Sequence, residues 1–576
     1  MTMPTHPRYR ILLVLAAVLA PPAGPASAQE PAAPLPVPGR SMVVTQYGMV
    51  ASSQPLAAQA AVRVLERGGN AMDAAIAANA AVGVMEPTGN GIGGDLFAII
   101  YDAGTGEVHG LNASGWAPAA LTPELLRERG IDEMPYRGIH AVTVPGAVGG
   151  WVAIHDRFGT LPLSTILAPA IHYAERGFPV AEVTAGLWSR SRELLAGRPN
   201  AAETFLIDGA TPEPGQIFRN PDLARTLGRI AERGAAGFYT GETAEAIVAA
   251  SDALGGTMTR ADLAEYEAEW VAPLSTRYRG WTVYELPPNG QGIAALMMLN
   301  LMERFPLGEY GFHSPAAMHV MIEAKKLAYA DMITYVGDPR FSDIPMTAMV
   351  DRAHAAERAG RIALDRAACS VEPSSYSGVT DRPDGETIYL TVIDEAGNIV
   401  SLIQSNYSGF GSGVVPDGMG FMLQNRGALF TLERGHPNVL APRKRPLHTI
   451  IPAFMERGDV KIGFGIMGGW NQAQAHAQFV SNVVDHGLTI QQALEAGRFR
   501  HQDFDGCGVW LEALVPAATR STLAELGHEV DVVPVRSATF GYGQAILSRG
   551  GIHFGASEPR HDGAAIPQSP PVFREE

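Results

Sequence analysis

Apolar residues recur along the chain in patterns that are typical of helices in some stretches and of strands in others. Alanine-rich periodic segments over 54–66 and 71–84 predict two helices, and Gly68-Gly69-Asn70 between them fits a helix stop and restart. An apolar run over 96–101 predicts a strand, whereas residues 150–335 are predicted to be mainly helical. This order of helical and strand-rich segments predicts a layered α/β sandwich.

A hairpin is the clearest local prediction. Two β-branched apolar runs over 387–393 and 399–405 flank a Gly397-Asn398 turn, and Thr387 opens the first strand. The stretch 368–384 before it is polar, rich in turn residues and without periodicity, which is where we expect a precursor to be cut. Farther on, a strand over 460–462 and helices over 471–484 and 489–498 are predicted.

Composition narrows the class of protein. The 576 residues are 46% hydrophobic and 18% charged, which indicates a globular chain. A net charge of −16 and the lack of basic clusters disfavour nucleic-acid partners. Arg8 and Arg10, the apolar run 11–20 and Ala-Ser-Ala at 26–28 predict a signal peptide over 1–28. We therefore expect export to the periplasm or beyond, with no membrane span, because ten apolar residues are too few to cross a bilayer.

Cysteine and histidine usage gives two further expectations. The 16 histidines show no metal-ligand spacing, so no metal site and no cofactor are predicted. Only Cys369 and Cys507 occur, so no disulfide framework is expected. A single bridge between these two is the less favoured alternative, and it would span the expected cut.

Two glycine clusters invite comparison with nucleotide-binding loops. Residues 89–94 match G-x-G-x-x-G, but they follow a helix and precede a strand, the reverse of a dinucleotide turn. We expect them to allow close backbone packing instead. Residues 463–468 have the strand-then-helix order and Asp485 about twenty residues on, so nucleotide binding stays open as an alternative. The helix predicted over 489–498 argues against it, because no second strand follows directly.

Thr387 matters because of what a cut before it would create. A new N-terminal threonine carries a free α-amine beside its own hydroxyl, and such an amine titrates at about 8. The amine is then able to accept the hydroxyl proton, which makes one residue both nucleophile and base. Taken alone, however, a threonine at the start of a strand is an ordinary structural residue.

Several motifs in one order strengthen the catalytic interpretation. They resemble those of the γ-glutamyltranspeptidase family of N-terminal-nucleophile hydrolases over about residues 40–565, and they lie at 67–75, 86–94, 144–146, 387–413, 444–452 and 465–469. The resemblance implies a four-layer αββα sandwich made by self-cleavage into a large subunit (29–386) and a small subunit (387–576). These subunits would stay together as a heterodimer. The resemblance also implies a small-molecule amide or γ-glutamyl substrate, with water or an amine as acceptor.

The same resemblance assigns roles to four residues. It implies that Thr387 is the nucleophile, that Ser405 hydrogen-bonds to it, and that the amides of Gly468 and Gly469 stabilise the oxyanion. Glycines followed by a helix suit that last role, because unpaired amides at the amino end of a helix favour negative charge. A strand-end serine with no such role is the alternative for Ser405.

Substrate recognition departs from the family pattern. The carboxylate-binding arginine of the family falls at Ser114, the aspartate that pairs with the substrate amine falls at Leu429, and the other substrate-binding positions hold Tyr407, Arg426, His448 and Thr449. A leucine does not neutralise an ammonium ion, so we hypothesise an acyl group without a free α-amine. Arg426 would bind a carboxylate, with hydrogen bonds from His448 or Thr449.

This pattern resembles glutaryl-type acylases and small-amide hydrolases more than a glutathione-degrading transpeptidase. Surface solvation of Arg426 and core packing of Tyr407 remain alternatives. A catalytically inactive periplasmic binding relative of the same fold is the competing function.

Overall fold

The computed structural model of the chain describes residues 1–2, 35–36, 38–374 and 386–574. The predicted signal peptide, apart from its first two residues, and most of the stretch expected to be cut lie outside these ranges. Among the described residues, no helix combines the length and the apolar character needed to cross a bilayer.

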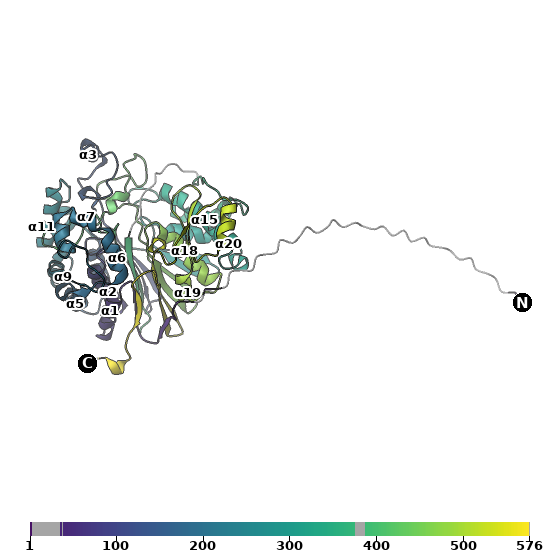
Figure 1. Cartoon of the computed structure of the whole chain (residues 1–576), viewed down its shortest axis with the longest axis horizontal. Coiled ribbons are helices and arrows are strands. Elements are labelled where there is room, and N and C mark those ends of the chain that lie inside the picture. The colour runs from purple at the N-terminus through teal and green to yellow at the C-terminus, as the bar shows by residue number, and fades with distance from the viewer. Residues whose placement is uncertain (3–34, 37, 375–385, 575–576) are drawn as a thin grey trace.

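Two antiparallel seven-stranded sheets lie face to face, with helices on both outer sides (Figure 1). The first sheet has the order β19 (Ala564–Pro567), β2 (Met49–Ser52), β10 (Glu386–Ile393), β11 (Ile399–Tyr407), β3 (Asp95–Asp102), β4 (Glu107–Ala113) and β7 (Glu269–Val271). The second has the order β1 (Val43–Thr45), β18 (Ile552–Ser557), β17 (Gly543–Arg549), β13 (Val460–Ile466), β12 (Ala453–Arg457), β9 (Trp281–Glu285) and β8 (Leu274–Tyr278).

Helices complete the sandwich on each side. The first sheet is covered by α1 (Pro55–Glu66), α2 (Ala71–Met85) and α4 (Ala147–Phe158), with α5 (Leu163–Arg176) and α9 (Pro221–Arg233) packed outside α2. The second sheet is covered by α13 (Gly292–Met302), α18 (Asn471–Val484) and α19 (Ile490–Glu495), with α15 (Pro315–Tyr335) outside α13. Separate hydrophobic clusters fill the space between the two sheets and the space under each helical layer. The predicted four-layer αββα sandwich is therefore confirmed.

The remaining elements are shorter or peripheral. The helices are α3 (Pro123–Glu128), α6 (Glu182–Arg190), α7 (Arg192–Ala196), α8 (Pro199–Phe205), α10 (Ala236–Tyr239), α11 (Gly241–Ala253), α12 (Arg260–Ala264), α14 (Leu307–Tyr310), α16 (Met346–Met349), α17 (Arg352–Ala359) and α20 (Ala517–Glu525). The 3₁₀ segments are η1 (Ile139–Ala141), η2 (Arg426–Leu429), η3 (Ala538–Phe540) and η4 (Pro571–Phe573), and the other strands are β5 (Phe178–Pro179), β6 (Ile217–Phe218), β14 (Phe499–His501), β15 (Gly508–Glu512) and β16 (Glu529–Val533).

Local sequence explains the predicted elements that the structure confirms. Asn70 and Asp73 form a capping box that starts α2, and every residue of that helix is buried. In β10, Ile388, Leu390 and Val392 pack under the helices, while Tyr389 and Ile393 pack against the second sheet. A strand buried on both faces reads as a continuous apolar run, which is the pattern that predicts the hairpin.

One region contains strands that the sequence did not lead us to expect. Residues 150–335 are mainly helical, as predicted, but they also contain β5 to β9. The signal was present, because Trp281, Val283 and Glu285 are buried at alternating positions of β9. The turn before β9, Arg279-Gly280, has φ values of 48° and 84°, as a tight hairpin turn requires.

Candidate active site

A β-bulge places Thr387 out of register between β10 and β11. Glu386 pairs with Tyr407 and Ile388 pairs with Gln404, so the register shifts at Thr387. Tyr407 has a φ of 78°, a left-handed conformation that is rare for a tyrosine. The backbone therefore departs from ladder geometry on both strands at this point, which leaves the Thr387 side chain free for other contacts.

Two side chains, those of Ser405 and Gln472, form hydrogen bonds with the Thr387 hydroxyl. Thr387 Oγ1 donates to Ser405 Oγ at 3.3 Å, and Ser405 Oγ donates to the carbonyl oxygen of Glu386 at 2.7 Å. Gln472 Nε2, from the first turn of α18, donates to Thr387 Oγ1 at 3.5 Å. The carbonyl of the peptide bond before Thr387 is thus polarised by Ser405, within reach of the Thr387 hydroxyl.

Gly468 and Gly469 lie where β13 gives way to α18. Their φ values are 127° and 58°, which a glycine adopts readily. Within the described chain, neither amide donates a hydrogen bond, whereas the Gly469 carbonyl accepts from Gln291 Nε2 at 2.8 Å. The turn therefore presents two unsatisfied donors at the amino end of the helix that carries Gln472, the residue that touches Thr387.

The glycine-rich segment 86–94 approaches the same place. A Cβ on Gly89 would lie 3.3 Å from the Thr387 nitrogen, and one on Gly94 would lie 2.5 Å from the Ser405 carbonyl oxygen. The Asn406 amide donates to the Gly89 carbonyl at 2.9 Å. The predicted close backbone packing is confirmed, and it is packing against Thr387 and Ser405.

The four residues predicted to bind substrate lie together behind Ser405. The Arg426 guanidinium stacks on the Tyr407 ring at 4.6 Å, and Arg426 Nη1 donates to Thr449 Oγ1 at 2.6 Å. His448 neighbours Thr449 in sequence, and all four side chains are buried. Burial excludes surface solvation as the role of Arg426.

Sequence reasoning missed Asp95, which organises this cluster. Asp95 pairs with Ser405 across β3 and β11, and its carboxylate accepts from His448 Nε2 at 2.9 Å, from the Gly115 amide at 2.8 Å and from Gln424 Nε2 at 2.9 Å. An aspartate directly after a glycine cluster and at the start of a predicted strand was the available signal.

The charges of Asp95 and Arg426 compensate each other where both side chains are buried. Burial raises the pKa of Asp95 to about 7, against the pull of Arg426 and of the donated hydrogen bonds. Burial lowers the pKa of Arg426 to about 10 and holds the pKa of His448 well below its usual value. His448 is therefore neutral, with Nε2 carrying the proton, because its Nδ1 accepts from the Ile450 amide at 3.3 Å. Arg426 Nε and Nη2 have no hydrogen-bond partner among the described residues.

Comparison with known proteins decides the family. The γ-glutamyltranspeptidase family model matches residues 57–568. The chain belongs to the γ-glutamyltranspeptidase family.

Relatives of this family member include several kinds of hydrolase. It is 37% identical over 539 residues to a glutathione hydrolase-like YwrD proenzyme of Bacillus subtilis, covering 92% of this chain and 99% of that protein. It is 35% identical over 537 residues to an oxamate amidohydrolase proenzyme of Klebsiella pneumoniae, covering 91% and 98%. The crystal structure of a cephalosporin acylase from Bacillus halodurans matches with a TM-score of 0.86 at 40% identity, covering 96% and 99%.

These matches make the chain an enzyme of the N-terminal-nucleophile hydrolase type, with amidohydrolase and acylase relatives. The nucleotide-binding alternative is wrong. Gly463 and Gly465 lie inside β13, where added Cβ atoms would meet Thr391 and Tyr389 of the first sheet. They serve sheet packing rather than a phosphate turn.

The γ-glutamyltranspeptidase-family chain has a cavity of about 440 Å³ next to Glu386, the residue before Thr387. Its lining includes Glu386, Ser408 and Gly468 together with Tyr136, Arg137 and Arg190. None of Tyr407, Arg426, His448 and Thr449 lines this cavity. The predicted substrate-binding residues are thus buried away from this cavity, whereas Glu386 lines it.

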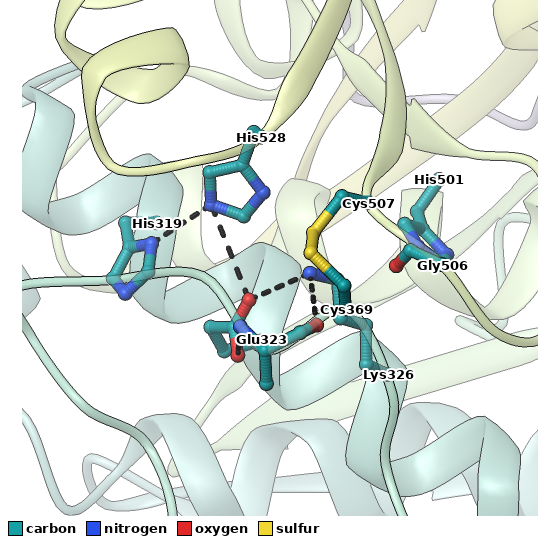
Figure 2. Close-up of a disulfide and its surroundings, with 9 residues drawn as sticks. His319, Glu323, Lys326, Cys369, His501, Gly506, Cys507 and His528 are labelled. Carbon is teal, nitrogen blue, oxygen red and sulfur yellow. Dashed lines mark hydrogen bonds and ion pairs between the residues drawn. A yellow bond between two sulfur atoms is a disulfide. The ribbon is translucent and has the colours of Figure 1, made fainter.

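A disulfide corrects the expectation drawn from the cysteines. Cys369 and Cys507 are bonded, with their Cα atoms 4.6 Å apart although 138 residues separate them in sequence (Figure 2). The less favoured alternative is therefore the right one. The bridge joins a residue before Thr387 to a residue after it.

A buried cluster beside the disulfide has the residue types of a metal site. The side chains of His319, Glu323 and His528 converge, as Figure 2 shows. His319 Nδ1 and His528 Nε2 share a hydrogen bond of 2.8 Å, and Lys326 Nζ lies 2.8 Å from Glu323 Oε1. The ammonium already neutralises the carboxylate and would repel a cation, so we assign no metal here.

Proposed function

We propose that this protein is an exported, self-processing amidohydrolase that forms a threonyl ester at Thr387. The observation that carries the proposal is the hydroxyl of Ser405 on the Glu386 carbonyl, beside the Thr387 hydroxyl at a bulged peptide bond. The proposed parts are a signal peptide (1–28), a large subunit (29–386) and a small subunit (387–576) that remain associated as a heterodimer. Export to the periplasm or beyond agrees with the disulfide, because such bonds persist in oxidising compartments.

Processing takes place in two steps. Thr387 Oγ1 attacks the Glu386 carbonyl carbon while Ser405 stabilises the developing oxyanion. The carbon–nitrogen bond then breaks, so that Glu386 becomes an ester on Thr387 Oγ1 and the nitrogen becomes a free α-amine. Water hydrolyses this ester, which leaves a Glu386 carboxylate and restores the Thr387 hydroxyl.

Turnover repeats the same chemistry on an external amide. The α-amine of Thr387 accepts the hydroxyl proton, Oγ1 attacks the substrate carbonyl, and the amides of Gly468 and Gly469 hold the oxyanion. The substrate nitrogen leaves with the proton as an amine. Water, or an amine acceptor, then releases the acyl group from Thr387.

The preferred acyl group has no free α-amine. Leu429 is buried and apolar, and the carboxylate of Asp95, which lies opposite Ser405 in the sheet, is already occupied by three donors. An ammonium ion here would be left unpaired, at a cost of several kcal/mol. Tyr407, Arg426, His448 and Thr449 lie behind Ser405, and the buried Arg426 adds positive charge to the surroundings of an anionic acyl group without lining the cavity. Oxamate, named in one relative, is likewise a carboxylate without an ammonium group.

Gel electrophoresis under reducing conditions tests the processing. Fragments of 358 residues (29–386) and 190 residues (387–576) are expected, and mass spectrometry should find a new chain that begins at Thr387. Thr387→Ala should stay in one piece. Thr391→Val, four residues along the same strand, is the matched control and should be cut normally. An uncut wild-type chain that hydrolyses amides would refute the mechanism.

A pair of anilides tests the substrate class. Glutaryl-anilide should be hydrolysed at least tenfold faster than γ-glutamyl-anilide, as the unpaired ammonium predicts. A preference for the γ-glutamyl compound contradicts this part of the proposal. The competing function, an inactive binding relative, predicts an uncut chain and no hydrolysis of either compound.

A further inference from the structure

The cavity beyond Thr387 has an unusual charge balance. Three arginines line it, Arg137, Arg190 and Arg500, and its single acidic lining residue among those described is Glu386. Arg190 is exposed at the end of α6, and Arg137 is held in place because its Nη1 donates to the Gly409 carbonyl at 2.8 Å. The cavity wall is therefore positively charged except for the residue whose peptide bond is to be cut.

The Glu386 side chain extends into this positive environment. A Cβ on Gly409 would lie 3.4 Å from Glu386 Oε2 and 3.3 Å from Ser191 Oγ, which places the carboxylate and the Ser191 hydroxyl beside Gly409. Burial raises the pKa of Glu386 to about 7, while the charges of Arg190 and Arg137 oppose that rise. The carboxylate is thus partly withdrawn from water and faces two cationic side chains.

Cleavage changes which groups remain at the cavity. Glu386 becomes a chain end and is no longer joined to Thr387, whereas Arg190 stays on α6 and Arg137 stays bonded to Gly409. Glu386 lies 17 positions after the bridged Cys369 in the sequence, a length of chain that reaches up to about 55–60 Å when extended. The disulfide therefore does not prevent the new terminus from leaving the cavity.

We propose that Arg137 and Arg190 form a carboxylate-binding subsite, occupied by the Glu386 side chain before cleavage and by a carboxylate of the substrate acyl group afterwards. Glu386 is itself the acyl group of the first reaction of the protein. Three carbons separate its reacting carbonyl carbon from its side-chain carboxylate carbon, the same spacing as in a glutaryl group. The inference deepens the proposed function and rests on it, since the subsite becomes available only when Thr387 has been released.

Kinetics on matched substrates test the subsite. Processed enzyme should hydrolyse glutaryl-p-nitroanilide at least tenfold better, in kcat/KM, than pentanoyl-p-nitroanilide, which has the same length and no carboxylate. Arg190→Gln should reduce this ratio to below threefold, mainly through KM for the glutaryl compound. Arg137→Lys keeps a donor for the Gly409 carbonyl and should reduce the ratio as well. Arg192→Gln, an exposed arginine on neighbouring α7, is the matched control and should keep the wild-type ratio.

A binding experiment gives a second readout that does not depend on turnover. Acetyl-Gly-Glu copies residues 385–386 and should bind processed protein by calorimetry, at least tenfold more weakly in Arg190→Gln. It should not bind the uncut Thr387→Ala chain, in which Glu386 already occupies the subsite.

The possible failures are distinguishable. If the arginine variants keep the wild-type ratio, if both substrates decline in parallel, or if Arg426→Met alone abolishes the preference, the subsite is overturned while the proposed function stands. If no fragment begins at Thr387 and neither anilide is hydrolysed, the proposed function fails and the subsite with it.

Discussion

Two covalent bonds join the region up to residue 386 to the region after it, and their surroundings differ. At Glu386–Thr387 the connection is a peptide bond at a bulge, beside unsatisfied amides, a polarised carbonyl and a cavity of about 440 Å³. At Cys369–Cys507 the connection is a disulfide beside buried side chains that are paired with one another. Reactive chemistry needs room and unsatisfied donors, whereas the disulfide lies among buried side chains that mostly pair with one another.

The contrast also explains how one chain could be cut and remain one particle. The β10 strand lies in the middle of the first sheet and is hydrogen-bonded on both sides, so cleavage at its end leaves its ladder intact. The disulfide adds a covalent connection on the opposite side of the sandwich. We therefore expect processed protein to run as one species without reductant.

The largest expected effect concerns the reactive connection. Ser405→Ala removes the donor to the Glu386 carbonyl and should slow the appearance of fragments by a factor of about 100 to 1,000. A time course on reducing gels measures this. Ser401→Ala, a buried serine on the same strand that bonds Tyr389 instead, is the control and should be processed at the wild-type rate. Equal rates for both variants would remove Ser405 from the reaction.

Loss of the Cys369–Cys507 disulfide should have the second largest effect. Cys369→Ser opens the bridge, so fragments should separate on gels without reductant, and the uncut Thr387→Ala background should lose about 3 kcal/mol of unfolding free energy. Urea unfolding gives the second value. Ser370→Ala, beside the cysteine and exposed, should change neither measurement. A wild-type protein that already separates without reductant would show that the bridge is not formed.

The buried charges of Asp95 and Arg426 should have a smaller effect, on the free energy of unfolding. Asp95→Asn leaves the buried Arg426 without its nearby negative charge and should lower the unfolding free energy by about 2 kcal/mol at pH 8. Arg426→Met in the same chain should restore more than half of that loss. If the double variant is as unstable as the sum of both changes, the two residues do not balance each other.

The smallest effect is a pH dependence of the unfolding free energy that arises from a hydrogen bond between the two regions. His313 Nε2 donates to the Gly497 carbonyl across the two regions, and burial lowers the pKa of His313 from 6.5 to about 4. The unfolded chain then binds more protons below pH 6.5, so unfolding free energy should fall by about 0.8 kcal/mol between pH 7.5 and 6 from this group. His313→Asn retains a donor and tolerates the φ of 53°, and it should lack this contribution. Urea midpoints of the wild type and of His313→Asn, measured at both pH values, test this. An equal pH dependence of the unfolding free energy in the two proteins would contradict the assignment of this effect to His313.

Much of the local structure could be predicted because short-range rules govern it. The hairpin of β10 and β11, the capped helix α2 and the glycine turn before α18 all follow from alternation, caps and turn residues. The short strands β5 to β9 were missed because strands of two to five residues give weak signals inside a long helical region. The roles of Thr387, Ser405, Gly468 and Gly469 followed from the family resemblance, and they remain proposals.

Contacts between distant residues could not be predicted. Arg426 is buried because Asp95, 331 positions earlier, supplies a compensating charge. The residues that neighbour Arg426 in sequence do not indicate this pairing. The disulfide likewise depends on two Cα atoms that come within 4.6 Å. Neither composition nor spacing contains these distances.

The order of residues alone therefore specified the repeating elements, the family and the chemistry that a threonine at position 387 is able to perform, since backbone preferences and motif chemistry act over a few positions. Folding decided which charges meet, which carboxylate faces the arginines of the cavity and which cysteines touch. Electrostatic and covalent pairing depends on separation in space, and that separation exists only after the two sheets have packed.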